Sequence, residues 1–101
     1  MAILEIATAA APVEPRVLRV LVADGHAATR AGIRAALEGA GFVVVAACAD
    51  AASAIAAADR HRPSISLVDV DLPGGGVSTA RAIAARPGAP IREPIVAGPL
   101  R

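Results

Sequence analysis

The sequence contains no lysine, asparagine, glutamine, tryptophan or tyrosine, and its single aromatic residue is Phe42. Any mechanism that needs a lysine ammonium group from this chain is therefore excluded. The formal net charge is only +1, and no basic cluster interleaved with aromatic residues is present. Such residues neutralise a nucleic-acid backbone and stack on its bases, so we expect no direct nucleic-acid partner.

Cysteine and long hydrophobic runs are equally scarce. Cys48 is the one cysteine, so it cannot form an internal disulfide, and its position in the apolar run 42–49 predicts a buried thiol. The longest apolar runs span about ten residues, too few to cross a bilayer. The alanine-rich start carries Glu5 and no basic residue before it, unlike a secretory signal. These features predict a cytoplasmic protein without membrane contact.

The chain is rich in small aliphatic residues. It has 101 residues, of which 55% are hydrophobic and 19% charged, and alanine alone supplies 27. This length suits one small domain. Because bulky residues are few, the core must be aliphatic and closely packed.

The hydrophobic pattern alternates between strand and helix. The expected strands cover 17–22, 42–48 and 64–68, and the expected helices cover 27–39, a segment capped by Asp50 and ending near 60, and 77–85. This order predicts an α/β fold, in which helices cover the faces of a parallel sheet of three or four strands. A fourth strand near Ile91 is doubtful, because Pro87, Pro90, Pro94 and Pro99 crowd this region.

Three segments follow from the same pattern. Residues 1–15 are small, apolar and interrupted by prolines, which predicts a mobile leader. The folded domain is expected over 16–91, and 92–101 is expected to be an irregular tail.

Two aspartates end the first and third expected strands. Asp24 and Asp69 should therefore lie at the same edge of the sheet, where functional groups of such folds collect. Paired carboxylates can share Mg²⁺, and one of them can then act as a nucleophile toward a phosphoryl group. The alternative is that both aspartates merely terminate strands at solvated turns.

The chain resembles the receiver domain of bacterial response regulators in three segments that lie in register, 16–26, 30–33 and 63–74. The resemblance is greatest to the branch whose receiver domains precede a LuxR-type helix-turn-helix domain. The resemblance covers about 16–91, and the 45-residue separation of Asp24 and Asp69 agrees with it. It implies a partial flavodoxin-like, three-layer fold and a non-enzymatic role in two-component phosphorelay signalling. A histidine kinase or phosphotransfer protein would phosphorylate Asp69. Asp24, Asp69 and the backbone carbonyl of Asp71 would hold Mg²⁺.

The chain also departs from this family. Gly25 stands where the family has a second adjacent acid, so Mg²⁺ binding should be weakened. The family's Ser or Thr at the fourth strand and Lys at the fifth have no counterpart, and Ser78 and Thr79 are assigned to capping or surface positions of the third helix.

We therefore expect a C-terminally truncated receiver that is out of frame or spliced from about Arg92, and exposed apolar faces that favour self-association. The alternative function is a degenerate pseudo-receiver or remnant that, if it acts at all, binds a protein without phosphotransfer.

Two other motifs lack residues that their functions require. Gly74–Gly76 lacks the Gly-Lys-Ser/Thr of a P-loop, and no His or Asp follows Ser78 to complete a hydrolase triad. His26 and His61 are predicted to be surface residues. Arg81 and Arg86 are predicted to line the solvated face of the third helix.

Overall fold

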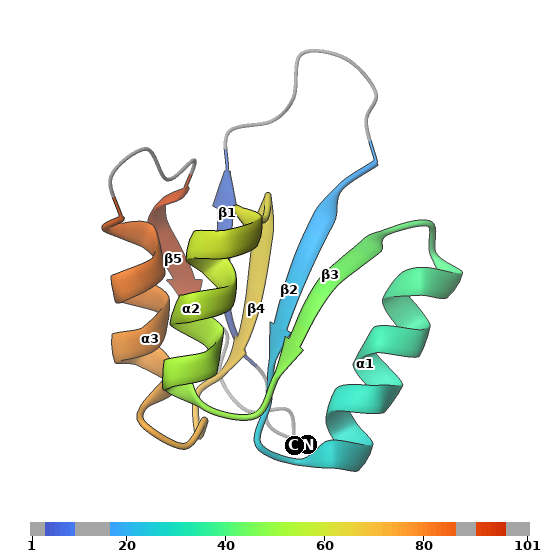
Figure 1. The fold of residues 1–101 in the computed structure, drawn as a ribbon, viewed down its shortest axis with the longest axis horizontal. Helices are drawn as coiled ribbons and strands as arrows, with labels where there is room; N and C mark the ends of the chain where they lie inside the picture. Colours follow the sequence, from blue (N-terminus) through green and yellow to red (C-terminus); the bar gives the residue numbers. More distant parts are fainter. Residues whose placement is uncertain (1–3, 10–16, 87–90, 97–101) are drawn as a thin grey trace.

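The computed structural model describes residues 4–9, 17–86 and 91–96. These residues form five strands and three helices, whose arrangement is drawn in Figure 1. In chain order the elements are β1 (Leu4–Ala9), β2 (Arg19–Ala23), α1 (Ala27–Gly39), β3 (Val43–Cys48), α2 (Ala51–His61), β4 (Ile65–Asp69), α3 (Gly76–Ala84) and β5 (Ile91–Val96).

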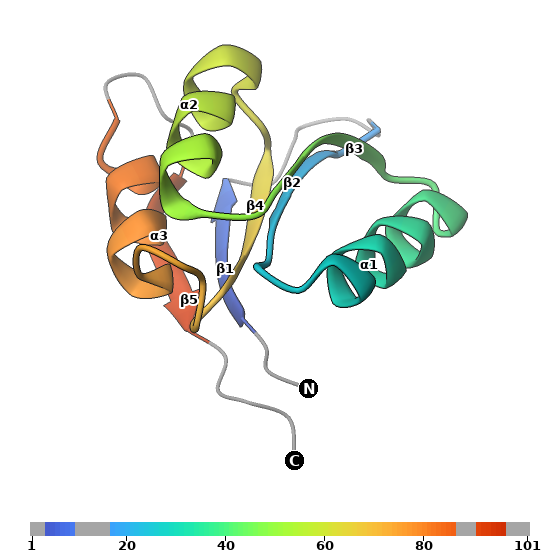
Figure 2. The same ribbon diagram turned by 60° about the horizontal axis from the view of Figure 1, so that its bottom comes forward.

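The described strands form one sheet in the order β3-β2-β4-β1-β5. β2 is parallel to both of its neighbours, β3 and β4, and helices connect these strands along the chain. Figure 2 shows α1 on one face of the sheet and α2 and α3 on the other. The structure thus confirms the α/β prediction of three parallel strands with alternating helices, as in a partial flavodoxin-like fold.

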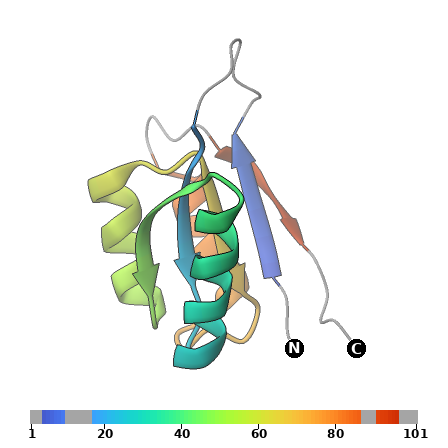
Figure 3. The same cartoon turned by 90° about the vertical axis from the view of Figure 1, so that its right-hand side faces the viewer.

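Two strands lie beyond the three that the sequence predicted clearly, one in the expected leader and one at the doubtful fourth strand near Ile91. β1 falls within the expected leader, and β5 extends from Ile91 through Pro94 into the expected tail. β1 pairs antiparallel with β4 on one side and β5 on the other, and Figure 3 shows these two strands side by side. The sheet is therefore mixed, not purely parallel. Pro94 is tolerated because β5 is the last strand in the sheet order, where one side of the backbone needs no strand partner. Residues 1–3 and 10–15 of the expected leader and 97–101 of the expected tail lie outside the described residues.

The core is divided between the two faces of β2. Val20 and Val22 pack with Val44 on the side where Ile33 and Leu37 of α1 make contact. On the other side, Leu21 and Ala23 belong to a larger cluster with the residues that α2, α3 and the loop before α3 contribute, Ala54, Ala58, Leu72, Ala80 and Ile83. Burial on both faces is typical of a central parallel strand.

Helix α2 shows how the alanine-rich composition serves this core. Ala54 and Ala58 are completely buried, and such small side chains let the helix backbone approach the sheet closely. Asp50 caps the helix as predicted, because its carboxylate accepts a hydrogen bond of 2.8 Å from the Ser53 amide. Cys48 is buried as predicted, and this burial raises the pKa of its thiol.

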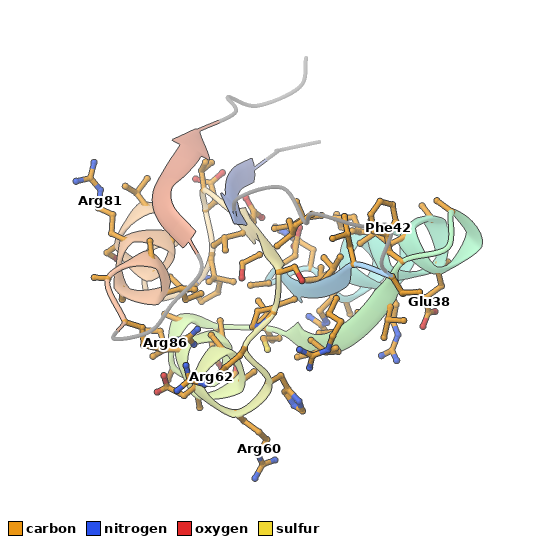
Figure 4. The ribbon with its side chains drawn as sticks, turned by 90° about the horizontal axis from the view of Figure 1, so that it is seen from above. Glu38, Phe42, Arg60, Arg62, Arg81 and Arg86 are labelled. Atoms are coloured by element: carbon orange, nitrogen blue, oxygen red, sulfur yellow. The ribbon has the colours of Figure 1, made fainter. Side chains whose placement is uncertain are left out.

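The prediction that Arg81 and Arg86 both face solvent is confirmed for Arg81 and wrong for Arg86. Figure 4 shows Arg81 extending away from the molecule, whereas Arg86 lies between α3 and α2. The Nε atom of Arg86 is 3.4 Å from a carboxylate oxygen of Asp59, and its side chain is only 10% exposed. Arg86, which follows the end of α3, therefore contacts α2 through Asp59 instead of facing solvent.

None of the helices in the described part of the chain combines the length and the hydrophobicity that crossing a bilayer requires.

Candidate functional site

The pairing of β2 with β4 brings two aspartates to one edge of the sheet. Ala23 of β2 pairs with Val68 of β4 in a parallel register, so the next residues, Asp24 and Asp69, lie side by side. In Figure 1 this edge is the lower rim of the sheet. Both aspartates are buried. The prediction that the strands place these carboxylates together is confirmed, and the alternative of two aspartates at solvated turns is contradicted.

His26 lies beside both carboxylates. Its backbone amide donates a hydrogen bond of 2.7 Å to Oδ1 of Asp24, which fixes the turn at the start of α1. Its ring Nδ1 is 3.2 Å from that same oxygen and 3.9 Å from Oδ2 of Asp69. The prediction that His26 is exposed is confirmed, since 73% of its side chain is accessible. The sequence reasoning missed its contact with both acids, although its position two residues after Asp24 at a strand-to-helix turn was a usable signal.

The turn after β4 holds the Asp69 carboxylate from the other side. The amide of Asp71 donates a hydrogen bond of 3.0 Å to Oδ1 of Asp69, and the amide of Leu72 donates one of 3.0 Å to its carbonyl oxygen. Helix α3 packs directly on this turn, because a Cβ atom added at Gly76 would overlap the carbonyl oxygen of Asp69. Asp71 thus supports Asp69 through its amide, and the predicted role of its carbonyl as a metal ligand stays a prediction.

Gly25 is exposed, but Pro73 in the loop after β4 lies next to the position of its missing side chain. A Cβ atom added at Gly25 would lie 2.8 Å from the Cδ atom of Pro73, closer than real Cβ contacts. An acidic side chain at this position would therefore require Pro73 to move. The guanidinium of Arg30 donates a hydrogen bond of 2.8 Å to the carbonyl oxygen of Asp24, which further fixes this turn.

The hydroxyl groups of α3 take no part in the site. Thr79 donates to the carbonyl oxygen of Gly75 at 2.6 Å, and Ser78 donates to the same oxygen at 3.2 Å. Both hydroxyls bond back to the residue before their own helix and do not cap it, since a capping side chain accepts hydrogen bonds from the helix amides. Ser78 is exposed, as one of the predicted alternatives had it, whereas Thr79 is buried, so the prediction is wrong for Thr79.

Three side chains could hold a cation together. Asp24, His26 and Asp69 each offer one ligand atom, and these atoms lie within 4.8 Å of one another. Two carboxylates from neighbouring strands are the kind of oxygen ligands that Mg²⁺ prefers, so the residues present fit this ion. The same carboxylates, buried at the edge of the sheet, could act on an anionic substrate with the help of the cation.

Comparison with known proteins agrees with this geometry. The family model of the response regulator receiver domain matches residues 20–96, a span that includes both aspartates and the four elements from α1 to β4 that surround them. No curated protein and no solved structure gives a significant match to the chain.

Proposed function

The chain belongs to the response regulator receiver domain family, and we propose that it acts in phosphorelay signalling by accepting a phosphoryl group on Asp69. One observation carries this proposal: Asp24 and Asp69, buried at adjacent strand ends, offer ligand atoms within 4.8 Å of each other and of His26. Burying two carboxylates side by side is costly unless a cation or a polar partner compensates for their charge. Such an arrangement is therefore typical of a functional site.

Asp69 is the nucleophile in this proposal. One of its oxygens attacks the phosphorus of a phosphohistidine, the new P–O bond forms as the P–N bond breaks, and the electron pair stays on the donor imidazole. Oδ1 accepts the hydrogen bond from the Asp71 amide, whereas Oδ2 accepts no hydrogen bond from a described residue and lies 3.9 Å from Nδ1 of the exposed His26 imidazole. Oδ2 is therefore the attacking atom that we propose.

Asp24 is the partner ligand in this proposal. It would hold Mg²⁺ together with Asp69 and the carbonyl of Asp71, and the ion would screen the negative charge of the incoming phosphoryl group. Since Gly25 provides no carboxylate and Pro73 lies against it, we propose that Mg²⁺ binds more weakly here than at a site with two adjacent acids. His26 and Arg30 position Asp24 through the hydrogen bonds described above.

The partners follow from this chemistry. We propose a histidine kinase or a phosphotransfer protein as the phosphoryl donor, a cytoplasmic location, and the LuxR-type branch as the nearest part of the family. The motif Asp24-Gly25-His26 with Asp69 and Leu72-Pro73-Gly74 supports this assignment.

Intact mass spectrometry tests the proposal. The protein is incubated with a small phosphodonor such as acetyl phosphate and with Mg²⁺, and the mass of one phosphoryl group should be added. Asp69→Ala should abolish the gain, and Asp24→Ala should reduce it by at least about tenfold, as expected when an ion ligand is lost. Asp71→Ala is the matched control, because this substitution keeps the backbone amide that contacts Asp69 and should leave the gain intact.

The opposite result has a definite meaning. If the folded protein gains no mass, or if Asp69→Ala gains as much as the unaltered chain, Asp69 is not a phosphoacceptor. The second candidate function, a pseudo-receiver that binds a protein without phosphotransfer, then stands. The missing second acid at Gly25 is the observation that favours it.

A further inference from the structure

The imidazole of His26 occupies a position that a metal ligand would take. Its Nδ1 atom is 3.2 Å from Asp24 and 3.9 Å from Asp69, and the ligand atoms of all three residues lie within 4.8 Å of one another. The two carboxylates are buried, whereas the histidine side chain is 73% exposed. A cation between them would be held by carboxylate oxygens on the protein side and by a nitrogen on the solvent side.

The backbone holds the ring in this place. His26 is the residue before α1, with an extended backbone, and its amide is bonded to the same Asp24 oxygen that the ring approaches. Arg30, one turn into the helix, bonds to the carbonyl of Asp24. The backbone of His26 is therefore tied to the Asp24 turn, and the ring itself is within hydrogen-bond distance of Asp24, because Nδ1 lies 3.2 Å from Oδ1. Little movement is then needed for Nδ1 to bind an ion shared by the two acids.

The nitrogen ligand changes which ion the site prefers. Mg²⁺ favours oxygen ligands in octahedral geometry, whereas imidazole nitrogen suits zinc and other first-row transition-metal ions. Gly25 adds no further oxygen, and Pro73 fills the space where an acidic side chain would begin. We propose that His26 is a third metal ligand and that Asp24, His26 and Asp69 form a site that binds Zn²⁺ more tightly than Mg²⁺. This inference rests on the proposed function insofar as the two aspartates hold the ion.

The geometry of zinc is compatible with phosphoryl transfer. Zinc sites with three protein ligands keep a fourth position open, and two carboxylates and one imidazole supply the required three. Ligation through Nδ1 uses the neutral tautomer of His26 that carries its proton on Nε2. The open position would remain available to an oxygen of an incoming phosphoryl group.

Calorimetric titration of the untagged full chain with Zn²⁺ and, separately, with Mg²⁺ tests this inference. The unaltered chain should bind one Zn²⁺ at least about tenfold more tightly than Mg²⁺. His26→Ala should weaken Zn²⁺ binding by at least about tenfold, the lower range for loss of a metal-site contact, and should change Mg²⁺ binding by less than about twofold. His61→Ala, which alters the other histidine, on α2, should leave both affinities unchanged.

Two further measurements make the outcome decisive. His26→Asn keeps a residue type that favours the start of a helix but removes the imidazole, so it replaces His26→Ala if that variant does not fold. Nitrogen NMR of the His26 ring should show that Zn²⁺ shifts Nδ1 more than Nε2.

The proposal is overturned if the unaltered chain binds no Zn²⁺, or if removing the imidazole leaves Zn²⁺ affinity unchanged while Asp24→Ala abolishes it. The second result would leave a site made of carboxylates alone. Neither result bears on whether Asp69 gains a phosphoryl group with Mg²⁺, so failure here and failure of the proposed function are distinguishable.

Discussion

Gly76 sets how closely α3 can approach the turn that follows Asp69. Gly76→Ala would place a methyl group against the carbonyl of Asp69 and the backbone of Val70, which cannot rotate away as a side chain could. We expect a loss of about 1–3 kcal/mol in the free energy of unfolding, typical of overpacking. The gain in helix propensity from alanine, up to about 1 kcal/mol, is too small to offset it.

Urea denaturation measures this effect, and Gly32→Ala is the matched control. Gly32 lies inside α1 and a Cβ atom there meets nothing within 4 Å, so this substitution should stabilise the protein by about 0.5–1 kcal/mol. Equal effects of the two substitutions would show that α3 does not pack on the turn as described.

At the scale of the element, the N-terminus of α2 links helix stability to pH. The Ser53 amide and then its hydroxyl bond to the Asp50 carboxylate, and these hydrogen bonds lower the pKa of Asp50 in the folded state. A carboxyl with a lowered pKa contributes stability above its unfolded pKa and loses that contribution as pH falls through its folded pKa. We therefore expect acidification to reduce the stability of the cap.

Asp50→Asn keeps a capping side chain but removes its charge, because asparagine also caps helices and does not titrate. The urea midpoint of the unaltered chain should exceed that of Asp50→Asn at neutral pH, and the difference should shrink on the acid side of the ordinary carboxyl range. A difference that stays constant over this pH interval would contradict the role assigned to the Asp50 carboxylate.

The molecule as a whole depends on a strand from its first residues. β1 lies between β4 and β5, and Ile6 is paired with Leu67 on one side and with Ile95 on the other. Proline at this position would remove an amide from the interior of the sheet and open the edge of β4, the strand that carries Asp69. We expect Ile6→Pro to lower the free energy of unfolding by about 1–3 kcal/mol and to increase self-association through the opened edge.

Urea denaturation and sedimentation velocity check both effects, with Ile6→Val as the control because valine suits a strand. If Ile6→Pro matches the control in stability and in association state, β1 does not pair with β4 in solution.

Local sequence patterns were sufficient to predict the elements around the site. Helical spacing predicted α1 with its bounds, the Asp50 cap predicted the start of α2, and two aspartates after apolar runs predicted the neighbouring carboxylates. In each case the signal lies within a few consecutive residues. Parallel pairing of strands then brings the two aspartates together without further information.

The features that the sequence did not predict depend on contacts between segments that are distant along the chain. β1 is stabilised by strands about 60 and 90 residues away, so its own short sequence carries little evidence of pairing. Pro94 argued against β5 because its position at the sheet edge could not be known. The place of His26 two residues after Asp24 could have indicated a contact with that acid, but only the approach of β4 brings Asp69 beside its ring.

Locating the phosphoryl group on the chain tests the central claim most directly. After reaction with acetyl phosphate and Mg²⁺, borohydride reduction marks the phosphorylated aspartate, and trypsin releases the peptide 61–81, which contains both Asp69 and Asp71. Fragmentation of this peptide in a mass spectrometer should place the mark on Asp69 and leave Asp71 unaltered. A mark on Asp71, or on an aspartate outside this peptide, would contradict the account.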